Sequence, residues 1–326
     1  MEGSLYMLVS EVMKKYITNI LIFFIVVSTI DICVGYAGDY LQSHAKGGST
    51  KEFDDLVTKD KHDVLILGSS RAHHHYDAPY MSKLLGLDVY NAGYDGNGIV
   101  LSYGILSMIV ERYKPKLVIF DVEPAFDIYE YKEDNNNKRY IHYLKPYFRT
   151  SEVGDIIREV SLEEWYKVHS GMIRYNTSIV QMILDNLREC STKNKGYAPL
   201  YGKYTKEPEK KVEGAKFLLD SFKLECVEKL IELAKDNNIP IIVMVSPHYG
   251  SEDSKDLRPV FDICEKNQVP FIDYYADEEF MQHKDWFKEP MHLNDDGAKV
   301  YTSIVSKKIK ECIEYIFSYN MIGGGK

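Results

Sequence analysis

Residues 63–79, DVLILGSSRAHHHYDAP, contain the pattern that decides the fold. Four apolar residues, Val64 to Leu67, stand between Asp63 and Gly68, which is typical of a short strand buried on both faces of a parallel sheet. The small residues Gly68-Ser69-Ser70 then turn the chain toward polar sequence and a predicted helix. Because open α/β sheets bind ligands at the carboxyl ends of their strands, this turn is a candidate site.

Four more apolar runs of strand length follow this first one. They lie at residues 88–90, 116–122, 239–245 and 269–274, and segments with helical spacing of apolar residues separate most of them. Alternation of strand and helix predicts a three-layer α/β/α fold with a five-stranded, mostly parallel sheet and helices on both faces.

Ser70 needs a base before it can act as a nucleophile, and the C-terminal region offers one. Glu289 stands three residues before His292, so the carboxylate can orient the imidazole while its other nitrogen faces a hydroxyl. His248, at the end of the fourth predicted strand, is a rival base without an adjacent acid. The alternative for the Ser69-Ser70 pair is a plain helix N-cap.

Three sequence blocks resemble those of the SGNH (GDSL-type) hydrolases. They are Gly68-Ser69-Ser70, Asn91-Ala92-Gly93 and Glu289-x-x-His292, and the resemblance spans residues 63–318. It implies a flavodoxin-like sheet and a serine hydrolase. Ser70 would be the nucleophile, His292 the base and Glu289 the acid that orients it.

The same resemblance implies an oxyanion hole formed by the N–H groups of Ser70 and Gly93. The family places an asparagine after the third strand, where this chain has Glu123, a carboxylate that would oppose a developing oxyanion unless it points away or binds another group. Asn91 and Asn97 are candidate replacements, and Asn97 is also a candidate substrate-binding residue.

Two further departures concern the serine block and the acid. Gly-Ser-Ser replaces the usual Gly-Asp-Ser and is similar to relatives that act on cell-envelope polymers, and Glu289 replaces an aspartate. Arg71 follows the serine and is a candidate for binding an anionic substrate group, with a structural ion pair as the alternative. The run at residues 73–75 is three histidines, which cannot all face one ion on a regular element, so we expect no metal and no cofactor.

Residues 16–37 form the apolar run of membrane length, and Lys14-Lys15 precedes it. Basic residues before the run favour a cytoplasmic N-terminus with the rest of the chain outside the cytoplasm. We interpret residues 1–37 as a cytoplasmic tail followed by an uncleaved signal anchor. A cleaved signal peptide, with Gly35-Tyr36-Ala37 as the cleavage site, is the alternative. Residues 38–60 are expected to be a linker and 61–326 the SGNH-like domain, with a helical insertion at about 128–210 that caps the site.

Composition restricts the possible partners. A net charge of −9 leaves no basic excess for nucleic acid, and the five cysteines lack the spacing of zinc ligands. The sequence therefore predicts an exported serine esterase or acyltransferase acting on O-acyl groups, preferentially O-acetyl groups, of cell-surface or extracellular polysaccharide. The alternative is an inactive protein of the same fold that binds glycan or an assembly partner.

Overall fold

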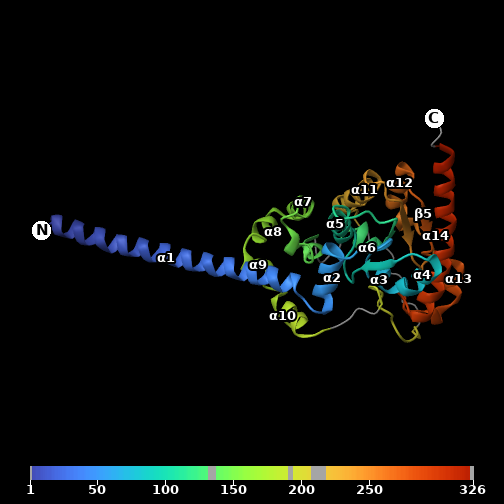
Figure 1. Cartoon of the computed structure of the whole chain (residues 1–326), viewed down its shortest axis with the longest axis horizontal. Helices are drawn as coiled ribbons and strands as arrows, with labels where there is room; N and C mark the ends of the chain where they lie inside the picture. The colour runs from blue at the N-terminus through green and yellow to red at the C-terminus, as the bar shows by residue number, and fades with distance from the viewer. Residues whose placement is uncertain (1, 131–136, 190–193, 207–217, 324–326) are drawn as a thin grey trace.

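The computed structural model describes residues 2–130, 137–189, 194–206 and 218–323 (Figure 1). Its centre is a parallel sheet with the strand order β2-β1-β3-β4-β5. The strands are β1 (Val64–Gly68), β2 (Val89–Gly93), β3 (Leu117–Asp121), β4 (Ile241–Val245) and β5 (Phe271–Asp273). The predicted five-stranded parallel sheet is confirmed, because every pair of neighbouring strands is parallel.

Helices cover both faces of this sheet and bury a separate apolar core on each. One face packs against α2 (Gly48–Thr58), α5 (Ile99–Val110), α11 (Ser221–Asp236) and α12 (Arg258–Asn267). The other packs against α3 (Ser70–His75), α4 (Ala78–Leu85), α13 (Glu278–Gln282) and α14 (Asp295–Gly323). The predicted three-layer α/β/α architecture is therefore correct. The apolar spacing of residues 211–235 also predicts a helix, of which residues 211–217 lie outside the described residues and Ser221–Lys235 belong to α11.

The strand order also determines where a ligand can bind. The chain moves from β1 outward to β2 and then returns to place β3 on the other side of β1. This reversal opens a crevice at the carboxyl ends of β1 and β3. The segments that follow those two ends begin α3 and the short helix α6 (Pro124–Asp127).

The N-terminal region differs from the expected anchor followed by a linker. A single helix, α1 (Glu2–Ser43), continues through residues 38–43 to the domain, and α2 occupies most of the rest of the expected linker. Phe53, Leu56 and Val57 of α2 are buried in the core. The polar sequence of residues 38–60 was misleading because only one face of α2 is apolar, which is enough for a helix at the edge of a core.

The insertion contains the predicted helices, but these helices are not a lid over the serine. Its elements are η1 (Asn137–Ile141), η2 (Lys145–Tyr147), α7 (Ser151–Val160), α8 (Leu162–Lys167), α9 (Gly171–Tyr175) and α10 (Ile179–Leu187). Helices α9 and α10 pack against α1, α10 also against α2, and α7 against α5. Residues 194–204 reach the serine side of the sheet instead: the Ala198 N–H donates to the His73 carbonyl at 3.1 Å.

Candidate active site

Ser70 stands at the end of a turn that only glycine permits. Gly68, the last residue of β1, has φ +145°, and a Cβ at this position would lie 2.6 Å from the Asp121 carbonyl oxygen of β3. Ser69 then becomes the N-cap of α3, with its hydroxyl accepting from the Arg71 N–H at 3.4 Å. Ser69 is therefore the N-cap of α3. The Ser70 hydroxyl does not cap the helix and contacts His292 instead.

The Glu289-x-x-His292 motif forms a small hairpin. Strands β6 (Phe287–Glu289) and β7 (His292–Leu293) are antiparallel, and Glu289 lies opposite His292. Residues directly opposite each other in a hairpin project to the same side, which is why a spacing of three brings the carboxylate to the imidazole. Phe287 and Leu293 are fully buried and fix the hairpin to the domain.

These two elements bring Ser70, His292 and Glu289 into one hydrogen-bonded chain. The Ser70 hydroxyl lies 2.8 Å from His292 Nε2, and His292 Nδ1 lies 2.6 Å from Glu289 Oε1. Burial lowers the pKa of His292, although the hydrogen bond to Glu289 partly offsets this effect. A neutral imidazole with Nδ1–H donated to the carboxylate presents its Nε2 lone pair to the serine hydroxyl, which is the arrangement that general-base activation requires.

His75 supports the strand that carries His292, and the sequence did not identify it as a site residue. Its Nε2 accepts the backbone N–H of Leu293 at 2.9 Å, one residue after His292. Complete burial holds the pKa of His75 well below its usual range, so it is neutral and able to accept this bond. The only signal in the sequence was its place in the 73–75 run, which has no sequence link to the hairpin more than two hundred residues away.

Arg71 does not face a substrate, which corrects the expectation that it binds one. Its side chain is completely buried, and Nη1 donates to Glu123 Oε2 at 2.7 Å, while Nε donates to the Ser246 hydroxyl at 3.1 Å. Glu123 therefore binds Arg71 rather than opposing an oxyanion. The ion pair joins the segment after β1 to the segment after β3. Arg71 therefore forms a structural ion pair, which was the alternative to substrate binding.

A buried carboxylate extends this network beneath the serine. Asp121, the last residue of β3, accepts from the Ser246 hydroxyl at 3.1 Å and also from the Tyr76 hydroxyl. Burial raises the pKa of Asp121 to about 6, although Arg71 acts in the opposite direction. The network connects α3, β3 and the end of β4, and it fixes the backbone from which Ser70 projects.

The predicted oxyanion donors are not all free. The Gly93 N–H donates to Asn91 Oδ1 at 3.0 Å, and Asn91 Nδ2 donates to the carbonyls of Ala72 and Tyr76. Asn91 and Gly93 therefore lock β2 to α3 here and do not present donors to a ligand. Among the described residues, no acceptor pairs with the Ser70 N–H, the remaining predicted donor.

Asn97 is also not arranged as a substrate contact. Its side chain is buried, and Nδ2 donates to the Asp95 carbonyl at 2.9 Å within the same loop. His248, the rival base, contacts the Ser251 hydroxyl at 2.9 Å and stacks on Tyr275. The imidazole within hydrogen-bonding distance of Ser70 is that of His292.

Two histidines of the 73–75 run lie beside the site with Asp95. His73 Nδ1 and His74 Nε2 lie 2.8 and 3.1 Å from Asp95 Oδ1, and the His74 ring centroid is 5.3 Å from that of His292. Their three potential ligand atoms lie within 4.8 Å of one another, so the group could hold a metal ion. Burial lowers the pKa of His74, but hydrogen bonds to Asp95 and Ala198 outweigh it and raise the pKa overall. A protonated His74 paired with Asp95, with His73 hydrogen-bonded to the same carboxylate, accounts for the same geometry, and our expectation of no metal remains a prediction.

Comparisons with known proteins give one kind of match, to solved structures. No family profile and no curated protein matches the chain. Among solved structures, a protein ascribed to the G-D-S-L lipolytic family from Desulfitobacterium hafniense matches with 12% identity and a TM-score of 0.38. The match covers 75% of this chain and 98% of the other.

Proposed function

We propose that this protein is a serine esterase or acyltransferase of the SGNH type. The observation that carries the proposal is the continuous chain from the Ser70 hydroxyl through His292 to Glu289, with distances of 2.8 and 2.6 Å. Three polar side chains from two distant segments meet in the order in which a nucleophile, a base and an orienting acid are required.

The reaction would proceed in two steps. Ser70 Oγ attacks an ester carbonyl carbon while its proton passes to His292 Nε2, and the tetrahedral intermediate expels an alcohol that takes the proton back. The acyl-enzyme then transfers its acyl group to water in an esterase or to a sugar hydroxyl in a transferase. The Ser70 N–H is the candidate donor for the oxyanion, and one such donor lowers the barrier by about 3 kcal/mol.

We propose O-acyl groups, preferentially O-acetyl groups, on cell-surface or extracellular carbohydrate as the substrate. The long apolar N-terminal helix, which is compatible with a signal anchor or signal sequence, supports an extracytoplasmic domain. The resemblance of the Gly68-Ser69-Ser70 block to envelope-acting relatives supports a polymer substrate.

The test uses the full chain in detergent. A fluorophosphonate probe, which reacts with activated serines, is applied to the wild type and to Ser70→Ala, His292→Ala and Ser69→Ala, and acetate release is measured with an aryl acetate and with acetylated polysaccharide. We expect labelling and release in the wild type and in Ser69→Ala, and neither in Ser70→Ala nor in His292→Ala. Equal labelling of Ser70→Ala would refute the proposal.

A non-catalytic glycan-binding protein is the second candidate. It is favoured by one observation, the use of the Gly93 N–H by Asn91, which removes a predicted oxyanion donor. It predicts a well-folded wild type that neither labels nor turns over, with carbohydrate affinity that Ser70→Ala leaves unchanged.

A further inference from the structure

The polar residue that interrupts the apolar run of α1 is bound by the insertion. Asp31 accepts hydrogen bonds from the Ser170 hydroxyl at 2.5 Å and from the backbone N–H groups of Gly171 and Met172 at 3.1 and 2.9 Å. A carboxylate in the apolar helix therefore satisfies the free N–H groups at the beginning of α9. Helix α1 is thus bound to the domain well before it ends.

Close backbone packing continues along the same two helices. A Cβ on Gly171 would lie 2.4 Å from the Asp31 carbonyl oxygen and 2.5 Å from the Gly35 Cα, so the helices approach more closely than any larger residue at Gly171 permits. One turn later, Gly38 faces the ring of Tyr175 in the same way. Small residues at matching positions are what allows two helices to pack this tightly.

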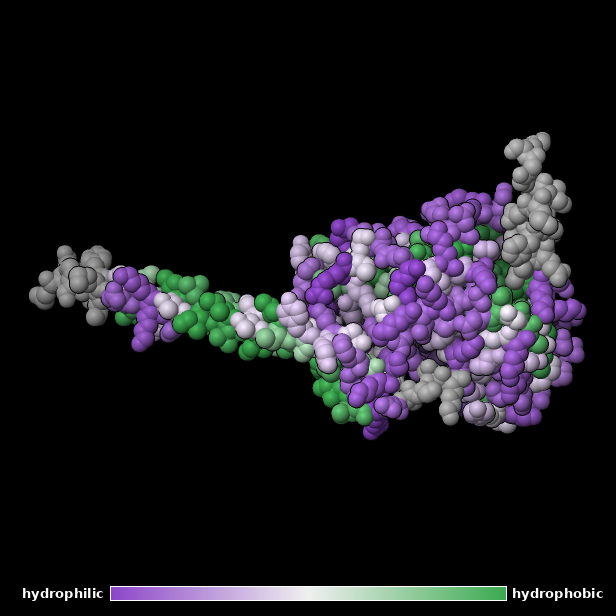
Figure 2. Space-filling view, in the orientation of Figure 1, coloured by the Kyte–Doolittle hydropathy of each residue, from purple (hydrophilic) through white to green (hydrophobic). Residues whose placement is uncertain are grey.

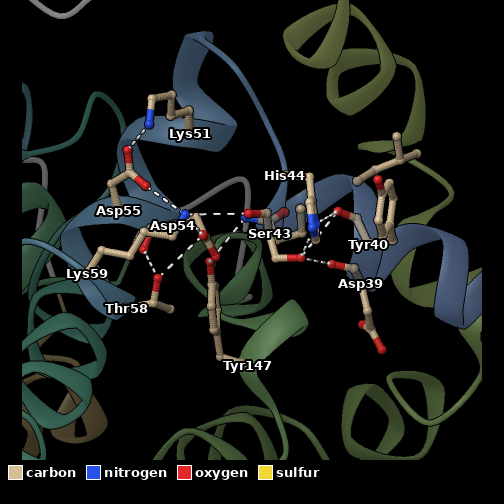
Figure 3. A network of polar contacts seen from close by, with 12 residues as sticks. Asp39, Tyr40, Ser43, His44, Lys51, Asp54, Asp55, Thr58, Lys59 and Tyr147 are labelled. Atoms are coloured by element: carbon tan, nitrogen blue, oxygen red, sulfur yellow. Dashed lines mark hydrogen bonds and ion pairs between the residues drawn. The ribbon is translucent and has the colours of Figure 1, made fainter.

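Polar contacts fix the last turns of α1. Asp39 contacts Arg174 at 3.3 Å and Arg149 at 3.2 Å, and it also accepts from the Tyr175 hydroxyl. Figure 3 shows the network at the next turn, where Lys59 donates to the Ser43 carbonyl and Tyr147 donates to Asp54. Helix α1 is therefore held from Asp31 to Ser43 as part of the domain.

The length of the exposed apolar span places this junction relative to a bilayer. From Tyr16 to Ile30 the helix rises about 22 Å at about 1.5 Å per residue. A hydrocarbon core is about 30 Å thick and requires about 20 residues. A span that begins after Lys15 therefore reaches Gly35 before it leaves the core. Because α9 packs against Asp31 and Gly35, a bilayer that surrounds this span would have its boundary at α9.

The helices around this junction expose apolar side chains to their surroundings. We call α9 and α10 the collar. Its exposed apolar residues are Met172, Ile173, Val180, Ile183, Leu184 and Leu187. Figure 2 shows the apolar band of α1 and an apolar patch over α10 where α1 enters the domain. Isolated exposed apolar residues are ordinary, but a group next to an exposed apolar helix has the character of an interaction surface.

We propose that the collar contacts the lipid bilayer in which α1 is embedded, and that α1 is retained as a structural part of the domain. The collar continues the exposed apolar surface of α1, so the occupant that covers α1 also reaches the collar. The apolar residues of the collar lengthen the apolar surface of α1, whose span from Tyr16 to Ile30 is shorter than the hydrocarbon core is thick. Cleavage after Ala37 would remove Asp31 and Gly35, and with them the cap of α9.

This arrangement fixes the orientation of the domain. Helix α1 enters at one end of the domain, and α3, which begins with Ser70, lies beyond α2 from that end (Figure 1). The candidate active site is therefore held away from the membrane surface that the collar contacts. This inference does not depend on the proposed chemistry of Ser70.

The test is the environment of spin labels on the full chain in vesicles of phosphatidylcholine and phosphatidylglycerol. Nitroxides are attached to cysteines introduced at Ile173 and Leu184, in a background in which Cys33, Cys190 and Cys312 are replaced by serine. Controls are labels at Tyr201 and Leu218, which are more exposed than Ile173 and Leu184 and lie outside the collar. Collisions with oxygen, which concentrates in lipid, are compared with collisions with a water-soluble nickel chelate.

We expect the collar labels to favour oxygen several-fold over the controls, and Asp31→Ala to shift the label at Ile173 toward the nickel chelate while the chain stays membrane-bound. Collar labels that match the controls would overturn the proposal. So would collar labels shielded from both reagents, which would indicate a protein partner or a second copy. The mass of the membrane-bound chain provides a second readout, because a chain beginning at Gly38 would show that α1 is not retained.

Discussion

The buried ion pair between Arg71 and Glu123 gives the sharpest prediction about stability. The side chains are 0% and 6% exposed and lie 2.7 Å apart, so neither charge is solvated by water. Arg71→Met removes the cation and leaves Glu123 and Asp121 buried without it. Removing one partner of a buried pair typically costs about 3–5 kcal/mol. At about 1.4 kcal/mol per tenfold change, this raises the unfolding equilibrium constant by about two to three and a half powers of ten.

The loss should depend on pH in a defined direction. Burial already raises the pKa of Asp121 to about 6 in the folded chain, and without Arg71, which opposes this rise, the folded-state pKa of Asp121 increases further above that of the unfolded chain. The folded variant then binds more protons than the unfolded chain, so its stability falls as pH increases from about 5 to 8. We therefore expect a larger loss at pH 8 than at pH 5.

The assay is urea unfolding of the full chain in detergent, followed by circular dichroism at both pH values. A double-mutant cycle of Arg71→Met with Glu123→Gln should show a coupling of about 1–3 kcal/mol, because the two residues share one interaction. The matched control is Arg158→Met, which breaks an exposed pair with Asp155 and should cost less than about 1 kcal/mol. A loss below about 1 kcal/mol for Arg71→Met at pH 8, or additivity in the cycle, would refute this reasoning.

Three predictions concern the hydrogen-bonded chain. Glu289→Ala should lower the rate of fluorophosphonate labelling about 10- to 100-fold, less than His292→Ala, because Glu289 is 57% exposed and water can replace its carboxylate; equal losses would contradict this. The labelling rate should increase with pH to a plateau, because only the neutral imidazole of His292 accepts the serine proton. Since burial lowers the pKa of His292, the inflection should lie below pH 6.5, and an inflection above pH 6.5 would show that the imidazole is not desolvated. His75→Ala should lower the free energy of unfolding in urea by about 1–3 kcal/mol and slow the labelling, because the buried Leu293 N–H loses its acceptor. His75→Gln, whose amide oxygen can accept the same bond, should restore part of the stability and part of the labelling rate. Equal effects of the two variants would exclude this role.

The sequence was sufficient for the parts of this protein that depend on local pattern. Short apolar runs bounded by Gly, Asp and Asn predicted the strands, because a strand buried on both faces must be apolar along its whole length. The spacing of Glu289 and His292 was similarly informative, since three residues is the separation that a tight hairpin brings together. Ser70 was identifiable because a glycine turn after a buried strand leaves few conformations for the next side chains.

Only the tertiary structure decided which polar residues face a ligand and which are internal. Arg71, Asn91, Gly93 and Asn97 are residue types typical of a binding site, but each is already hydrogen-bonded within the protein. Arg71 and Asn91 bind groups from remote segments, whereas the partners of Gly93 and Asn97 lie two residues away in the chain. Asp31 interrupts the apolar run of α1, and the structure shows that it caps a helix more than a hundred residues away. Such pairings depend on distances between segments that are remote in sequence, and no local pattern of residue types encodes those distances.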